Sequence, residues 1–293
     1  MSSPPPPQPG ILAFGTTHHA YVELDLIDGT EWTAIAAGLA GLTHTMTPGS
    51  GCMMVLGVRP SLWRRVRPDV CPSDVHDFAD AVVGDDGFTM PATQHDLCVW
   101  LAGSAQDVVF DEVLAIIAAL APFAAVATEE VGWTYRYHRD LTGFVDGTEN
   151  PKQQEVGEVA IIPDGPAAGA SVLLLQKWPH DPSWQTLPVE AQEAAIGRTK
   201  ADDIELDPKP VTSHAARTDQ DELGKIVRRN LGYGRATDHG TMFVGMTKDQ
   251  SILERMLARM AGCDGEPRDE LTRYSRAVTG AYYVLPKLAD VVG

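Results

Sequence analysis

Cysteine and basic side chains are the scarce components of this 293-residue sequence. Its four cysteines lie far apart and form no CxxC pair, which argues against a structural zinc site and fits a reducing compartment. Lysine and arginine number 23 against 40 acidic residues, so the formal net charge is -17. A surface this negative repels phosphate backbones and anionic lipid headgroups, so we expect neither nucleic acid nor membrane as a partner.

Segments that direct a chain into or across a membrane are also missing. The opening residues MSSPPPPQPG lack the basic and apolar regions of a signal peptide, and four consecutive prolines favour an extended conformation. The longest apolar stretch, residues 113–127, is too short for a bilayer and contains Pro122. We therefore expect a flexible tail over residues 1–10 and a cytoplasmic protein.

Common metal and phosphate motifs are absent too. No pair among the nine histidines has HxxxH or HExxH spacing. The glycine-containing run 225–234 lacks the GxxxxGK[ST] pattern of a phosphate-binding loop. A histidine acting as a metal ligand would thus need its other ligands from a cofactor, such as the four nitrogens of a macrocycle.

Apolar residues make up 44% of the chain, enough for a sizeable core. Their periodicity predicts a similar series of elements twice, which indicates an α+β protein of two ferredoxin-like halves, residues 11–140 and 141–293, with antiparallel sheets and peripheral helices. In the first half we expect strands at 21–26, 52–58, 96–102 and 126–138, with helices at 31–41 and 106–120. In the second half we expect strands at 171–176, 241–246 and 281–285, with helices at 189–198 and 250–260.

The segment Gly143–Pro151, GFVDGTENP, has the densest pattern of turn-forming and acidic residues. Two glycines bracket Asp146, and Asn-Pro closes the run. An ordinary surface turn with an Asx-type bond is one interpretation. The other is that Gly143 and Gly147 let the backbone approach a flat ligand that Asp146 faces.

Two further segments contain candidate site residues. His214 stands alone in PVTSHAAR, between a loop and a polar run, and a lone histidine is most often a surface or core residue. In KIVRRNLGYG, Arg228 and Asn230 lie two apart, which in a strand places both on one face. A solvated basic edge explains the second segment equally well.

Together these segments resemble the dye-decolorizing peroxidases, most closely their bacterial B-type members, over nearly the whole chain. The resemblance is carried by MPATQHDL at 90–97, GFVDGTENP at 143–151, IGRTK at 196–200, the Ser213-His214 pair and IVRRN at 226–230. The family fold is a pair of ferredoxin-like halves, like a dimeric α+β barrel, and agrees with the duplicated pattern.

The resemblance implies a role for each candidate residue. His214 matches the histidine that ligates haem iron on one side, and haem is expected in the second half. Asp146 matches the acid–base residue on the opposite (distal) side, with Arg228 and Asn230 beside it. Binding of the cofactor is further expected to involve Gly147, Thr148 and Arg198, the last near a haem propionate.

The implied activity is a peroxidase that uses haem b, iron protoporphyrin IX. It reduces hydrogen peroxide and oxidises dyes or other bulky, dye-like or phenolic reductants, and relatives form homo-oligomers. A carboxylate beside Arg228 is expected to stay ionised, so we expect an acid pH optimum. In the family the iron-ligating histidine bonds to a carboxylate, for which Asp269 is the candidate, although Arg273 occupies a nearby position.

Three alternatives remain open at this point. The same pocket could release iron from haem and leave the porphyrin intact, as proposed for some relatives (a deferrochelatase). A haem-binding or haem-buffering protein would need His214 but not the pair of Asp146 and Arg228. Some relatives are cargo of protein nanocompartments and carry a carboxy-terminal extension, whereas this chain stops soon after its last expected strand.

Overall fold

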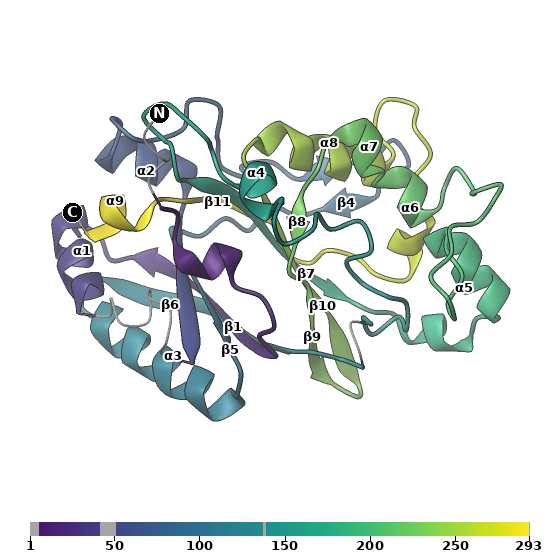
Figure 1. Ribbon diagram of the computed structural model, residues 1–293, viewed down its shortest axis with the longest axis horizontal. Coiled ribbons are helices and arrows are strands. Elements are labelled where there is room, and N and C mark those ends of the chain that lie inside the picture. The colour runs from purple at the N-terminus through teal and green to yellow at the C-terminus, as the bar shows by residue number, and fades with distance from the viewer. Residues whose placement is uncertain (1–5, 42–50, 137–138, 293) are drawn as a thin grey trace.

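A computed structural model describes residues 6–41, 51–136 and 139–292 of the chain (Figure 1). The first half contains strands β1 (His18–Leu26), β2 (Cys52–Val58), β3 (Val82–Val83), β4 (Thr89–Met90), β5 (Leu97–Gly103) and β6 (Ala124–Trp133), with helices α1 (Trp32–Ala40), α2 (Pro60–Val66) and α3 (Gln106–Leu120). The second half contains strands β7 (Ser171–Pro179), β8 (Val227–Arg228), β9 (Leu231–Arg235), β10 (Asp238–Thr247) and β11 (Ala281–Leu285), with helices α4 (Val156–Ala160), α5 (Val189–Ile196), α6 (His214–Arg217), α7 (Gln220–Leu223), α8 (Gln250–Ala261) and α9 (Leu288–Val292).

Each half has the ferredoxin-like strand order. In the first half the strands lie in the order β6-β1-β5-β2, and in the second in the order β11-β7-β10-β9, all antiparallel. Counted along the chain, both orders read fourth, first, third, second. The two sheets meet edge to edge, β6 against β9 and β2 against β11, so the eight strands close into a ring. The predicted pair of ferredoxin-like halves is confirmed.

The strand alternation separates the inside of the ring from its outside. On β7, Leu173 and Leu175 face the interior cluster, whereas Leu174 packs with the outer cluster of the second half. The outer face of the first sheet is covered by α1 and α3, whose apolar side chains bury Leu39 and Leu120 completely. Burial of this stripe is the main stabilising contribution of these two helices.

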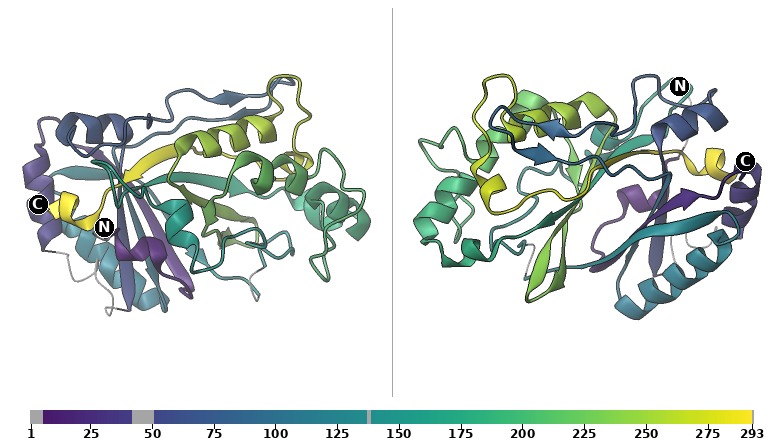
Figure 2. Two further views of the ribbon diagram at one scale, coloured as in Figure 1. Left: turned by 45° about the horizontal axis from the view of Figure 1, so that its top comes forward. Right: turned by 180° about the vertical axis from the view of Figure 1, so that it is seen from behind.

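The outer face of the second sheet is covered less completely. Helix α8 packs on it through Leu253, Met256 and Leu257. Helix α5 instead lies at the far end of the molecule, where it contacts α6 and the 3-10 helix Glu270–Arg273 (Figures 1 and 2). This displacement leaves space between the sheet and the segments around α6.

The structure differs from the sequence analysis at two points: the predicted tail, and the condition that Arg228 and Asn230 lie in one strand. Of the predicted tail, residues 1–5 lie outside the described residues, but Gln8 is fully buried and its side-chain amide bonds to the backbone of Leu56 and Pro286. Arg228 and Asn230 do not share a strand, because β8 ends at Arg228 and β9 begins at Leu231. At the break between the two strands, the Val244 N–H donates to the side-chain oxygen Oδ1 of Asn230 at 3.1 Å.

Across residues 6–41, 51–136 and 139–292, no helix has both the length and the apolar character needed to cross a bilayer.

Candidate active site

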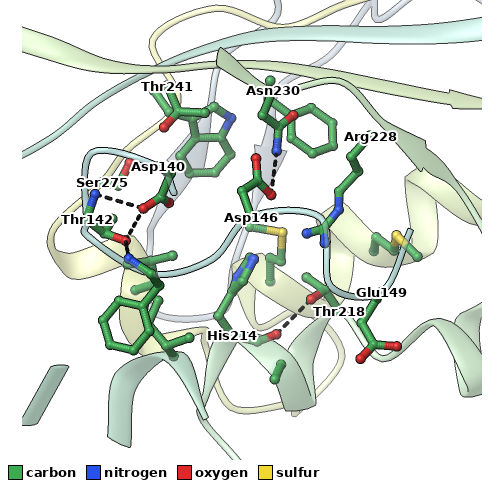
Figure 3. Close-up of a pocket in the computed structure, with 18 of the residues that line it drawn as sticks. Asp140, Thr142, Asp146, Glu149, His214, Thr218, Arg228, Asn230, Thr241 and Ser275 are labelled. Atoms are coloured by element: carbon green, nitrogen blue, oxygen red, sulfur yellow. Dashed lines mark hydrogen bonds between the residues drawn. The ribbon is translucent and has the colours of Figure 1, made fainter. Parts of the chain in front are cut away.

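The space beside α8 is a pocket of about 1280 Å³, its solvent-open part included. Its walls come from the outer faces of β7 and β10, from α8, and from the loops around residues 140–149 and 213–230 (Figure 3). Six of the seven residues predicted for the site line it: Asp146, Thr148, Arg198, His214, Arg228 and Asn230. Gly147 borders an adjoining cavity that shares Asp146, Arg228 and Asn230 with the pocket. The structure therefore brings together residues that are up to 84 positions apart.

His214 begins helix α6, where Ser213 caps the helix by accepting from the Ala216 N–H. Its Nδ1 lies 2.6 Å from Oδ2 of Asp269, a carboxylate with no exposed surface. A carboxylate oxygen accepts in this contact, so Nδ1 carries its proton, and the neutral form of the ring has its lone pair on Nε2. Figure 3 shows the ring pointing into the pocket toward Asp146. The geometry is that of an imidazole prepared to bind a metal through Nε2.

The pair of His214 and Asp269 is held by contacts on both sides. Asp269 Oδ1 accepts from Leu271 N–H at 2.9 Å, which caps the 3-10 helix that follows. Arg217, also buried on α6, pairs with Glu266 at 2.6 Å. Arg273 pairs with Glu270 at 2.9 Å and leaves Asp269 free to bond His214. Asp269 is therefore the carboxylate partner of His214 in this structure, as the sequence suggested.

Asp146 lies across the pocket from His214 and is oriented by Asn230 (Figure 3). Asn230 Nδ2 donates to Asp146 Oδ1 at 3.4 Å. Because Asn230 Oδ1 accepts from Val244 N–H, its NH₂ group must be the end that faces Asp146. The amide thus holds one carboxylate oxygen and leaves the other toward the pocket.

The loop that carries Asp146 is fastened to β8 by Asn150. Its amide donates to the backbone oxygen of Arg228 at 2.9 Å and accepts from the backbone N–H of the same residue at 2.8 Å. Gly147 has a φ of +84°, and a Cβ there would lie 3.0 Å from Asn150 Nδ2. The glycine is needed for the turn itself and for this contact. Asn150 lies in the motif, but sequence reasoning gave it no role.

Arg228 reaches the pocket from β8 and has an unused donor there. Its buried Nε has no hydrogen-bond partner among the described residues. Within the described part of the chain, Arg228 and Asp146 form no ion pair shorter than 4.0 Å. The side chain that binds the Asp146 carboxylate is therefore Asn230 and not Arg228. An unpaired buried donor costs about 1–3 kcal/mol, which an anionic ligand oxygen would offset.

Arg198 and Thr148 lie at the rim and share Asp203. Arg198 Nε donates to Asp203 Oδ1 at 2.7 Å, and Thr148 Oγ1 donates to Asp203 Oδ2 at 2.6 Å. Glu149 and Glu205 also pair with Arg198, at 3.3 and 3.5 Å. Three carboxylates around one guanidinium mean that an incoming propionate would compete for Arg198. Its role in propionate binding stays a prediction.

Asp140 is a site residue that sequence reasoning missed. It lines both the pocket and the adjoining cavity. Burial and the negative charge of Asp146 raise the pKa of Asp140 from 3.8 to about 6, against the opposing hydrogen bonds from Thr142. Its position six residues before Asp146 in the same loop was the available signal.

The rest of the wall is apolar and suits a flat hydrophobic ligand. Side chains from β10 and α8 form it, among them Phe243, Leu253, Met256, Leu257 and Met260. One imidazole nitrogen on one side, a carboxylate and an arginine on the other, and apolar side chains between them fit the needs of a haem. None of the described residues forms a cluster of three or more histidine, cysteine or acidic side chains that could hold a bare metal ion.

The two halves match two family models, described as Dyp-type peroxidase, N-terminal, over residues 8–134, and Dyp-type peroxidase, C-terminal, over residues 137–290. The chain belongs to the Dyp-type peroxidase family. It is an enzyme of a haem peroxidase family.

Named relatives and solved structures agree with this assignment. The chain is 33% identical to a dye-decolorizing peroxidase of Rhodococcus erythropolis over 98% of this chain and 88% of the relative. It is 36% identical to one of Mycolicibacterium paratuberculosis over 97% and 84%. The structure of DyPB from Rhodococcus jostii superposes with a TM-score of 0.89 at 31% identity, covering 98% of this chain and 97% of that one, and variants of that protein were solved in complex with haem.

Proposed function

We propose that this Dyp-type peroxidase binds haem b through His214, reduces hydrogen peroxide, and oxidises bulky organic reductants such as dyes or phenols. The observation that supports this best is the arrangement across one apolar pocket. His214 presents Nε2 from one side, while Asp146 and the unpaired donor of Arg228 stand on the other.

When bound, the haem supplies the redox chemistry that passes electrons from the reductant to the peroxide. Asp146 is placed to take a proton from one peroxide oxygen and return it to the oxygen that leaves. Asn230 holds Asp146 in one orientation through the contact at 3.4 Å. The positive charge of Arg228, which lines the pocket, stabilises negative charge on the departing oxygen.

His214 and Asp269 act on the other side of the cofactor. The hydrogen bond of 2.6 Å fixes the tautomer and the ring orientation of His214. It also raises the basicity of Nε2, which favours the more oxidised states of a bound iron.

We also propose an acid optimum, based on Asp140 and not on an ion pair between Arg228 and Asp146, which these two described residues do not form. Below a pH of about 6, Asp140 is neutral and adds no negative charge to the distal side. Above it, a second negative charge disfavours the hydroperoxide anion that must form. We expect dye oxidation to peak at acid pH and the Asp140→Asn variant to lose less activity toward neutral pH. A native profile that is flat from acid to neutral pH would contradict this.

The deciding experiment is the absorbance spectrum of the purified protein with added haem, before and after rapid mixing with hydrogen peroxide. The native chain should bind haem and change its Soret band within the mixing time. His214→Ala should lose haem, whereas Arg228→Leu should bind haem but respond slowly to peroxide. Arg235→Leu, an exposed arginine on the β9–β10 hairpin, is the matched control and should behave as the native chain does.

The same measurements separate the other candidate functions. A haem-buffering protein would bind haem but show no rapid change with peroxide. A deferrochelatase would release free protoporphyrin, which absorbs and fluoresces differently from haem. The presence of Asp146, Asn230 and Arg228 together favours the peroxidase.

We further propose that the protein is a cytoplasmic homo-oligomer. Light scattering of the purified protein tests the oligomeric state, and fractionation of the source cells tests the compartment.

A further inference from the structure

The interior of the ring contains a polar cluster just behind the distal wall of the pocket. Arg229 lies between the pocket residues Arg228 and Asn230, but its side chain points the other way. The guanidinium donates to Ala13 O and to Thr16 Oγ1, and its Cζ lies 5.5 Å from the centre of the Trp100 ring. One residue therefore links the site to the aromatic core.

His19 is the centre of this cluster and is buried. Its Nδ1 lies 3.2 Å from the Trp100 Nε1 and 3.2 Å from the Tyr21 hydroxyl, and its Nε2 lies 2.8 Å from Thr16 Oγ1. An indole N–H can only donate, so Nδ1 of His19 must be the acceptor and Nε2 must carry the proton. The Tyr21 hydroxyl therefore shares Nδ1 with the Trp100 N–H as its acceptor.

Burial and the charge of Arg229 make it unfavourable for the His19 imidazole to hold a second proton. Burial and the nearby Arg229 hold the pKa of His19 well below its usual range. A proton arriving at Nδ1 is therefore not retained, and Nε2 releases its own proton toward Thr16. Both Thr16 and His19 line the cavity that also contains Asp140 and Asp146. The cluster thus borders the same cavity as the two carboxylates of the distal side.

We propose that Tyr21 and His19 form a redox-active pair that holds an oxidising equivalent produced by the peroxide reaction when no reductant is bound. This inference rests on the proposed function, which supplies the oxidant. With haem bound and peroxide as the oxidant, Tyr21 would give up one electron as its O–H bond breaks. The proton passes to His19 Nδ1, and the His19 Nε2 proton moves through Thr16 into the shared cavity. An electron from the reductant and a proton returning by the same route restore Tyr21.

The choice of Tyr21 over Trp100 follows from acidity and charge. Both side chains contact His19 Nδ1, but an oxidised phenol is a much stronger acid than an oxidised indole, so Tyr21 loses its proton more readily and becomes neutral. Oxidised Trp100 that keeps its proton is a cation, which the nearby guanidinium of Arg229 disfavours.

Freeze-quench electron paramagnetic resonance of the haem-loaded full chain, mixed with hydrogen peroxide without reductant, tests the pair. In the native chain, ring-deuterated tyrosine should narrow an organic radical signal. Tyr21→Phe, which keeps the ring packing, should lose most of that signal. His19→Gln should lower it as well, because glutamine does not take up and pass on the proton. Tyr282→Phe, another buried tyrosine, on the outer face of β11, is the control and should keep it.

The outcomes separate this inference from the proposed function. If peroxide changes the haem absorbance but tyrosine deuteration leaves the radical signal unaltered, the pair is wrong and the peroxidase stands. The same holds if Tyr21→Phe retains the full tyrosyl signal. If peroxide leaves the haem absorbance of the native chain unchanged, both are overturned.

Discussion

The two sheets have the same strand order, but their outer faces have different roles. On the first sheet, α1 and α3 contact each other and close the face with apolar side chains such as Ile35, Leu39 and Ile116. On the second sheet, α8 covers one part and the remainder is the pocket that contains His214. The same topology thus gives a solid core in one half and a cofactor site in the other.

The connections to the first helix of each half account for the difference. A short link, residues 27–31, joins β1 to α1, so α1 must pack directly on the sheet. The link from β7 to α5 contains a 3-10 helix, Pro182–Thr186, and directs α5 to the end of the molecule (Figure 2). Residues 197–226 then return across the opening and bring α6 to the pocket. Strand order alone does not decide whether a sheet face becomes core or site.

The largest effect is expected from a truncation on the packed side. Leu120→Ala should lower the free energy of unfolding of the haem-free protein by roughly 2–5 kcal/mol, because it leaves a cavity in a filled core. Met256→Ala removes a side chain that already borders open space, so the loss should be about half as much or less. Urea unfolding of both variants measures this. Equal losses would show that the two faces are packed alike.

A second prediction concerns the partner of His214 on the hollow side. Asp269→Asn removes the charged acceptor at 2.6 Å and should weaken haem binding by about 10- to 100-fold. Haem titration followed by absorbance measures the affinity. Glu270→Gln changes the neighbouring carboxylate, which pairs with Arg273, and should leave haem binding close to native. Equal losses in both variants would deny Asp269 its specific role.

The smallest effect is a pH-dependent one at Asp140. The pKa of about 6 in the folded protein lies above the usual 3.8, so ionised Asp140 destabilises the fold. In the haem-free protein, Asp140→Asn should differ little in stability from the native chain near pH 4, exceed it increasingly up to about pH 6, and keep a constant advantage above that. Unfolding curves at both pH values test this, with exposed Asp80→Asn as the control. A stability difference that does not change with pH would argue against the raised pKa.

Periodicity predicted the elements that alternate regularly, and the structure confirms Cys52–Val58, Gln106–Leu120 and Ala281–Leu285 with the same bounds. In such segments local pattern and burial agree. The pocket was not predictable in this way, because it depends on where long connections place α5 and α6. Asp140 was not predicted as a site residue for a similar reason. Its raised pKa arises from burial and from the charge of Asp146, and both depend on the folded structure.

The residue roles came mainly from the resemblance in motifs, and the contacts in the structure explain some of them. The second residue of the Ser213-His214 pair has Asp269 as its partner, 55 positions along the chain, a spacing that no local pattern encodes. Arg228 and Asn230 both line the pocket although β8 ends at Arg228, and at the break before β9 an asparagine side chain accepts the Val244 N–H. When a side chain replaces a backbone acceptor in the hydrogen-bond ladder of a sheet, the hydrophobic periodicity of the sequence does not change.

The two junctions that close the ring, β6 with β9 and β2 with β11, differ in how many residue pairs they contain. The smaller junction is reinforced by a side chain. Strands β2 and β11 share a single residue pair, Val58 with Val284. The side chain of Gln8 bridges that junction, with three hydrogen bonds of 2.8 Å to Leu56 and Pro286. Gln8 thus connects the two halves of the protein by hydrogen bonds across this junction. Deleting the chain up to and including Gln8 would open the ring between β2 and β11, outside the haem pocket. The amide hydrogens of β11 would then be among the first to exchange with solvent.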